Sequence, residues 1–285
     1  METNQFKKGG LFKTNWAYLA WLFFYMFISW IVLGANWLAF GITCGVYAVS
    51  VTVALTIGEY ILRYIQGLRR VMTRDEKEYL LDIFQEVYGE AKEKYHRLSS
   101  GIELFLSDKM LVNAYAMGRK SIILTKGAIQ TFSREELKGV LAHEFGHLAN
   151  GDTKALLLNL VGNGFFTLMT IAARIFMFFA TLIMNAFDET GIFNMIMKFF
   201  RWVFDMIILI LLGLGNVLLS LNSRNSEFMA DKFASDIGFN KELVDLLKIL
   251  MEISMPGDIS LLERLQASHP HTAERIARLE GMQED

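Results

Sequence analysis

The sequence predicts a mainly α-helical integral membrane protein with four transmembrane helices and a cytoplasmic α+β domain that contains a small β-sheet. Two observations predict the membrane part: 53% of the 285 residues are hydrophobic, and they gather in four long runs. A third predicts the folded domain, because the polar blocks between these runs show helix and strand patterns. Only 20% of the residues are charged, against about 25% in an average soluble domain.

Each apolar run is long enough to cross the hydrocarbon core of a bilayer, which takes about 20 residues of helix. The first run is too long for the apolar part of a cleavable signal peptide and lacks an A-x-A-like site, and a second run follows it at once. We therefore predict membrane spans at about 16–33, 37–57, 155–184 and 199–221.

Lysine and arginine residues predict the orientation, because they gather on the cytoplasmic side of membrane helices. Three lysines precede the first span and four arginines follow the second, whereas the link over 34–36 is uncharged. The outer loop of the second hairpin carries Asp188 and Glu189, and Lys198 and Arg201 weaken this asymmetry without reversing it. We expect both termini and every polar block on the cytoplasmic side of the cell (inner) membrane.

Two charged residues, Arg174 and Asp205, fall inside the predicted third and fourth spans. A charge within a bilayer is costly unless it is paired or reaches the headgroups. Both residues lie far from the cytoplasmic ends of their spans, so in an antiparallel hairpin they could pair near the outer interface. Separate contacts with lipid headgroups are the alternative.

The polar blocks predict a domain of helices and short strands. A helix is predicted to start at Ser133 and to run to about Gly151. Its start is indicated by a capping box, in which the side chains of Ser133 and Glu136 each bind the backbone N–H of the other residue. We expect further helices at 75–98, 226–237, 240–253 and 272–279. Strand-like runs that predict the small sheet lie at 103–106, 111–117 and 120–124.

The H-E-x-x-H pattern formed by His143, Glu144 and His147 predicts a zinc site within the helix that starts at Ser133. Residues four apart share one face of a helix, so both imidazoles can bind one metal ion. The glutamate between them can act as a general base. Cys44 is the single cysteine, so the metal must be held by histidine and carboxylate.

A catalytic zinc site needs a third protein ligand. The H-E-x-x-H-x-x-G-x-x-H pattern is absent, because Asn150 and Thr153 stand where its glycine and last histidine would be. Five residues are candidates for the third ligand: Asp152, Glu227, His96, His269 and His271.

Glu227 is the preferred third ligand, because Asp231 follows it by one helical turn. A carboxylate in that position can accept a hydrogen bond from a ligand imidazole and fix its tautomer. A solvated charge on a helix is the alternative for Glu227. Asp152 fits better as the N-cap of the next helix, since D-T-K-A leads into an apolar run.

Residues 111–279 resemble the HtpX-type membrane metalloproteases, which are related to the type 1 CAAX prenyl proteases. The matching motifs occur in one order: N-A-Y-A-M-G at 113–118, H-E-F-G-H at 143–147, S-R-x-x-E-x-x-A-D at 223–231, and S-H-P with E-R-I at 268–276. The resemblance implies a gluzincin-type peptidase that binds one Zn²⁺ per chain, with Glu227 as the third ligand. Ser226 stands where many relatives carry a second arginine, so a substrate contact by that arginine is not expected here.

The resemblance also implies roles for residues near the cleft. The strand of Asn113, Ala114, Tyr115 and Ala116 would pair with an extended substrate through main-chain hydrogen bonds; an edge strand without this role is the alternative. His269 and Arg275 match family positions near the cleft, and either could stabilise the developing oxyanion. A contact between helices is the alternative for both, and His271 and His96 have no implied role.

The predicted function is zinc-dependent cleavage of misfolded or membrane-associated polypeptides at the cytoplasmic face of the membrane, with Glu144 as general base. Protein quality control is what the family suggests. Processing of lipidated, CAAX-type peptides and a non-catalytic zinc-binding scaffold or chaperone are the alternatives. The net charge of −2 gives no reason to expect nucleic acid as a partner. We predict four segments in this order: an N-terminal transmembrane hairpin (1–66), a first catalytic part with H-E-x-x-H (67–154), a second transmembrane hairpin (155–222) and a second catalytic part with Glu227 (223–285).

Overall fold

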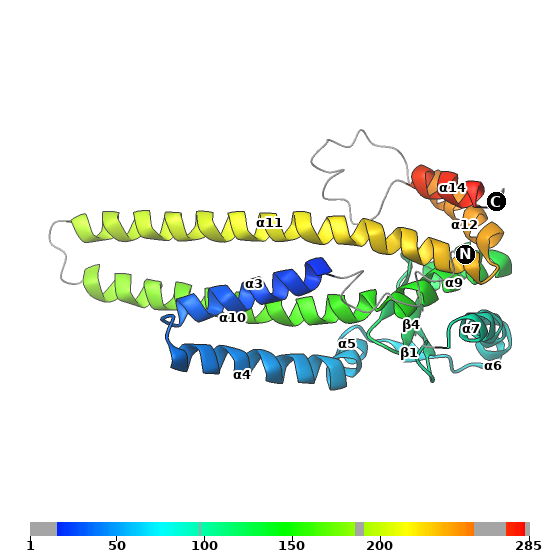
Figure 1. Ribbon diagram of the computed structural model, residues 1–285, viewed down its shortest axis with the longest axis horizontal. Helices are drawn as coiled ribbons and strands as arrows, with labels where there is room; N and C mark the ends of the chain where they lie inside the picture. Colours follow the sequence, from blue (N-terminus) through cyan, green and yellow to red (C-terminus); the bar gives the residue numbers. More distant parts are fainter. Residues whose placement is uncertain (1–15, 97, 186–190, 254–271, 283–285) are drawn as a thin grey trace.

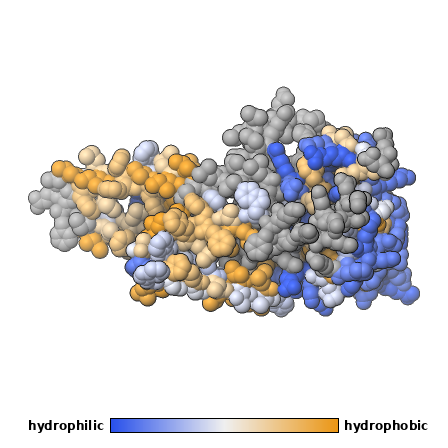
Figure 2. Space-filling model, viewed as in Figure 1, coloured by the Kyte–Doolittle hydropathy of each residue, from blue (hydrophilic) through white to orange (hydrophobic). Residues whose placement is uncertain are grey.

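The computed structural model describes residues 16–96, 98–185, 191–253 and 272–282. Long helices lie side by side in one half of the molecule, and a small sheet with shorter helices forms the other half (Figure 1). The apolar surface follows this division, because hydrophobic residues cover the long helices and hydrophilic residues cover the other half (Figure 2).

The long helices come from the predicted apolar runs. The first hairpin consists of α3 (Trp16–Val32) and α4 (Trp37–Val53), which continues through a π-helical turn (Ala54–Gly58) into α5 (Glu59–Ile65). The second hairpin consists of α10 (Asp152–Asn185) and α11 (Ile192–Asp236).

One helix among the described residues, the 29-residue stretch Trp37–Ile65, is long and apolar enough by itself to cross a membrane. Shorter apolar helical stretches occur in α3 and α10, at Leu19–Ile31 and Thr170–Ile183. Many large apolar side chains on these helices are exposed, as in Phe176 at 73%. The expectation of four spans stays a prediction.

Helix α11 differs from the sequence-based expectation. We expected the fourth span to end near 221 and a separate helix to begin at 226, but α11 runs unbroken for 45 residues. No glycine or proline occurs between Gly215 and Gly238, so the polar residues after the apolar run do not end the helix. Gly238, with φ +96°, follows the end of α11.

The two charged residues of the second hairpin form an ion pair. Arg174 on α10 donates from Nη2 to Asp205 Oδ1 on α11 at 2.7 Å. This contact confirms the prediction that Arg174 and Asp205 pair with each other, rather than the alternative that each contacts lipid headgroups separately. One residue comes from each helix, so the pair joins α10 to α11 at this point along their lengths.

The sheet has four strands in the order β1-β2-β4-β3. These are β1 (Arg69–Arg70), β2 (Glu103–Ser107), β3 (Ala114–Met117) and β4 (Ser121–Thr125). β2 is parallel to β4, whereas β1 pairs antiparallel with β2 and β3 pairs antiparallel with β4. β4 is buried along its whole length, and β3 lies at an edge with one neighbour.

Helix α9 (Arg134–Asn150) is central to the other half of the molecule. It packs between α7 (Asp82–Lys94), α11 and α12 (Asn240–Ile253) around one hydrophobic core. The expected helix over 75–98 appears as α6 (Arg74–Glu76), a π-helical turn (Lys77–Leu81) and α7. Two short helices complete this half. α8 (Lys126–Thr131) was not predicted, whereas α14 (Thr272–Gly281) matches the helix expected over 272–279.

The opposite face of the sheet is covered by α5. Phe105, Met117 and Ile123 form a second buried cluster there, with Leu62 and Leu68 packed against it. The last turns of the second apolar helix therefore contribute to the core beneath the sheet.

Candidate metal centre

Both ends of helix α9 are fixed by local sequence. Ser133 caps its start: the Ser133 side chain accepts a hydrogen bond from the Glu136 N–H, and Glu136 Oε2 accepts one from the Ser133 N–H at 2.7 Å. Gly151 ends it in the left-handed region, at φ 78°. Between these ends, His143 and His147 lie one turn apart on the same face, as the sequence predicts.

Two glycines let α9 approach its neighbours closely. A Cβ on Gly146 would lie 2.7 Å from Ala230 Cα on α11, and one on Gly139 would lie 2.6 Å from the Glu242 backbone carbon on α12. Ordinary contacts need 3.4 Å or more. The crossing at Gly146 brings α11 close enough for Glu227 to reach both histidines.

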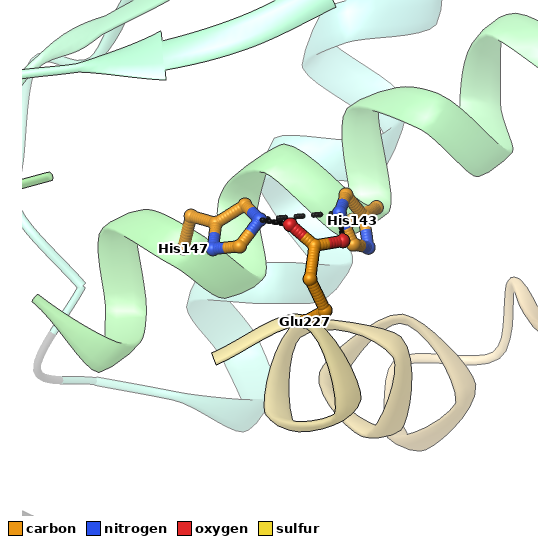
Figure 3. A group of neighbouring side chains, drawn as sticks. All are labelled: His143, His147 and Glu227. Atoms are coloured by element: carbon orange, nitrogen blue, oxygen red, sulfur yellow. Dashed lines mark hydrogen bonds and ion pairs between the residues drawn. The ribbon is translucent and has the colours of Figure 1, made fainter. Parts of the chain in front are cut away.

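His143, His147 and Glu227 converge as the sequence predicts (Figure 3). The two Nε2 atoms lie 3.1 Å apart. Glu227 Oε2 lies 3.4 Å from His143 Nε2, and Oε1 lies 3.5 Å from His147 Nε2. Donor atoms around a tetrahedral zinc ion with bonds of about 2.0–2.2 Å lie about 3.4 Å from one another, so this set fits zinc.

A carboxylate holds the other ring nitrogen of each histidine. Asp231 Oδ1 lies 2.9 Å from His143 Nδ1, and Asp152 Oδ2 lies 2.9 Å from His147 Nδ1. Both carboxylates therefore favour the tautomer that leaves Nε2 free to bind a metal ion. Asp231 has the contact that the sequence predicts for it.

The contact of Asp152 with His147 was not predicted. We expected Asp152 to serve as a helix cap, and it is indeed the first residue of α10. The left-handed Gly151 turns the chain back, so that Asp152 also reaches His147. A glycine followed by an aspartate directly after the histidine helix is the sequence signal that could have indicated this contact.

Arg275 on α14 contacts two carboxylates of the site, Asp231 and the metal-binding Glu227. Its guanidinium donates from Nε and Nη2 to the two carboxylate oxygens of Asp231, at 2.8 and 2.6 Å. Nη1 lies 3.2 Å from Glu227 Oε2. Burial alone would raise the pKa of Asp231, but hydrogen bonds from His143 and Arg275 lower it.

These contacts favour a positioning role for Arg275, and its contact with substrate stays a prediction. His269 and His271, the other candidates from the C-terminal segment, lie outside the described residues. His96 is exposed and is not part of the metal-binding group.

The pKa of both histidines is raised. Burial and the Arg275 charge lower the pKa of His143, but hydrogen bonds to carboxylates outweigh them. Burial lowers the pKa of His147 as well, yet its carboxylate neighbours raise it well above its usual value. The site therefore holds an excess of negative charge, which suits a divalent cation.

Glu144 lies beside the edge strand. Its Oε2 accepts a hydrogen bond from the Ala116 N–H at 2.7 Å, and the side chain is buried. Because neighbouring residues of a strand point their backbone groups to opposite sides, Ala114 and Ala116 both face away from β4. Asn113 is bonded on the β4 side, where its carbonyl accepts from the Thr125 N–H at 3.1 Å.

Comparison with known proteins identifies the family. Residues 74–283 match the model of peptidase family M48. Protease HtpX of Hahella chejuensis (strain KCTC 2396) is 27% identical over 272 residues, which cover 86% of this chain and 87% of that protein. Protease HtpX of Legionella pneumophila (strain Corby) is 29% identical over 223 residues, which cover 69% of this chain and 76% of that protein.

The fold is also similar to the crystal structure of S. mikatae Ste24p. The TM-score is 0.56 at 18% sequence identity, and the match covers 91% of this chain and 62% of that one. At this identity the likeness concerns the fold alone. Together with the family match over most of the sequence, these similarities show that the chain belongs to peptidase family M48 and is a metalloprotease of the HtpX type.

Proposed function

We propose that this protein is a zinc-dependent endopeptidase that cleaves misfolded or membrane-associated polypeptides at the cytoplasmic face of a membrane. The observation that carries the proposal is the convergence of two histidine Nε2 atoms and the Glu227 carboxylate, with the carboxylate of Glu144 beside them. A purely structural zinc site has four protein ligands and needs no general base.

His143, His147 and Glu227 would hold the zinc ion. A bound zinc ion supplies Lewis-acid chemistry, which polarises the scissile carbonyl and makes water a stronger acid. Asp231 and Asp152 keep the imidazoles oriented, and Arg275 offsets the charge of the buried carboxylates. Asp231 and Asp152 each contact the imidazole nitrogen that does not face the metal-binding group.

Glu144 would act as general base and acid. It would take a proton from the attacking water and pass it to the amine that leaves when the peptide bond breaks. Its hydrogen bond to Ala116 fixes the carboxylate at the edge of the sheet. Catalysis then takes place directly beside the strand that would hold the substrate.

β3 would bind the substrate by strand addition. The outward-facing backbone groups of Ala114 and the Ala116 carbonyl can pair with an extended peptide and give affinity with little dependence on sequence; the Ala116 N–H is bonded to Glu144. Asn113 and Tyr115 would belong to the same substrate-binding strand, although the Asn113 carbonyl is bonded to Thr125 and the Tyr115 side chain packs beneath the sheet. Such binding suits unfolded chains, because a folded protein rarely presents a free extended segment.

The place of the metal-binding residues along the chain supports the proposed substrate class. His147 lies three residues before the end of α9, and α10 begins after one intervening glycine. Glu227 lies on α11, the helix that contains the predicted fourth span. With four spans, the site lies close to the membrane surface, where membrane proteins and chains presented at that surface are within reach.

Cleavage of an unfolded protein tests the proposal. Purified protein in detergent should cleave casein with zinc present and should not after chelation, and Glu144→Gln should bind zinc but not cleave. Cleavage that survives Glu144→Gln would refute the mechanism. If Glu227→Ala binds one zinc ion per chain with unchanged affinity, the ligand assignment is wrong. Cleavage of a prenylated CAAX peptide but not of casein would favour the processing alternative.

A further inference from the structure

The turn between β3 and β4 is bound by a carboxylate from the first hairpin. Glu59 is the first residue of α5, which continues the second apolar helix. Its Oε2 accepts a hydrogen bond from the Arg119 N–H at 2.8 Å. Its Oε1 accepts from Ser121 Oγ at 2.6 Å and from the Lys120 N–H at 3.3 Å. One carboxylate thus accepts hydrogen bonds from three successive residues, Arg119 and Lys120 of the turn and Ser121 at the start of β4.

Gly118 allows this close approach. It has φ +64°, and a Cβ there would lie 2.4 Å from Glu59 Oε2. On its other side, Thr153 Oγ1 of α10 donates to the Gly118 carbonyl at 2.6 Å. The turn is therefore held between the first hairpin and the start of the second.

Two further contacts tie the same segment to the sheet. Gln66, directly after α5, accepts a hydrogen bond from the Tyr115 hydroxyl at 2.5 Å. Leu62 packs beneath the sheet beside Met117, the last residue of β3. β3 has only four residues and one neighbouring strand, so these contacts add to its pairing with β4 and its packing on α9 in holding its position.

We propose that Glu59 is a positioning residue for substrate binding, which makes the first hairpin part of the peptidase site. The inference rests on the proposed role of β3 as the strand that binds substrate. Ala116 precedes Gly118 by two residues, so a shift of the turn moves the Ala116 carbonyl that would pair with substrate. Glu59 itself lies on the other side of the strand and acts on the substrate only through it.

Steady-state kinetics of peptide cleavage test this role. Glu59→Ala removes all three acceptor contacts, and we expect KM to rise about tenfold, the effect of losing one charge-assisted hydrogen bond, with kcat changed less. Glu59→Gln keeps one acceptor oxygen and should restore part of the loss. Zinc content should stay at the wild-type level in both variants, because no metal ligand contacts Glu59.

Matched variants separate the possible explanations. Glu78→Ala removes an exposed carboxylate that pairs with Arg74 outside the sheet, and its KM should equal that of the wild type. Ser121→Ala removes one donor to Glu59 and should raise KM in the same direction, which provides a second test if Glu59→Ala does not fold. Ala114→Pro removes an outward N–H of the edge strand other than the one that binds Glu144, and it tests the strand itself.

The outcomes distinguish this inference from the proposed function. An unchanged KM in Glu59→Ala and Ser121→Ala, with a raised KM in Ala114→Pro, would overturn the positioning role and leave the substrate strand intact. An unchanged KM in all three would overturn both. If KM rises as much in Glu78→Ala as in Glu59→Ala, the loss of any carboxylate has this effect, and the inference is also overturned.

Discussion

The close crossing of α9 and α11 makes Gly146→Ala a sharp test of how the metal site is built. The new Cβ would lie 2.7 Å from Ala230 Cα and 2.9 Å from the Ala230 carbonyl oxygen, where contact requires at least 3.4 Å. The helices must therefore separate by 3.4 − 2.7 = 0.7 Å or more. Backbone atoms cannot rotate away as a side chain can, so Glu227 moves away from the histidines.

This displacement exceeds what a metal site tolerates, because ligand distances are fixed to within about 0.2 Å. We expect Gly146→Ala to lower zinc affinity at least tenfold and to destabilise the protein by about 1–3 kcal/mol, as overpacking does. Competition with a chromogenic chelator measures the affinity, and thermal unfolding of the metal-free protein measures the stability.

Gly89→Ala is the matched control. Gly89 lies in helix α7 with no atom within 4 Å of the added methyl group. Alanine there should stabilise the protein by about 0.5–1 kcal/mol, because glycine is a poor helix former. If Gly146→Ala binds zinc as tightly as the wild type and unfolds at the same temperature, the close crossing does not set the ligand geometry.

Three further predictions concern the groups around the ligands. Asp152→Asn should lower zinc affinity about 10- to 100-fold, since outer carboxylates contribute this much to metal sites; unchanged affinity in a zinc titration would show that Asp152 is only a helix cap. Arg275→Lys should lower the unfolding temperature and zinc affinity together, because a lysine cannot donate two parallel hydrogen bonds to Asp231; a variant like the wild type in both would argue against the positioning role. Because folding raises the pKa of both histidines, their protonation stabilises the metal-free protein at pH values below about 6.5, the pKa of histidine in the unfolded chain. This stabilisation is lost as the pH rises through the higher pKa values of the folded protein. Zinc binds neutral imidazole, so the rise in unfolding temperature on adding zinc should be larger at pH 8 than at pH 6; the reverse order would contradict the assigned shifts.

The three metal-binding residues could be predicted because their spacing is local. H-E-x-x-H needs only one helix, and the capping box at Ser133 indicates where that helix starts. Glu227 is distant in sequence, but its spacing from Asp231 and the family resemblance pointed to it. The contact of Asp152 with His147 was missed because it depends on where the chain goes after the left-handed turn at Gly151, and the sequence shows that a turn occurs but not which side chain it brings to the histidine.

Features that depend on tertiary structure were missed or misjudged. β1 has two residues and α8 has six, too few for a hydrophobic period to show. The unbroken course of α11 was missed because a change from apolar to polar residues suggested a boundary, although no helix-breaking residue is present there. Glu59 gave no signal, because its partners are mostly backbone N–H groups about sixty residues away.

The single course of α11 has a mechanical consequence. Asp205 and Glu227 differ by 22 positions on one helix, which at about 1.5 Å per residue places them about 33 Å apart on a rigid rod. A slip of α11 by one turn would move both by about 5.4 Å, breaking the ion pair with Arg174 and withdrawing Glu227 from the histidines together. The distant ion pair and the metal site therefore depend on the same alignment of α11.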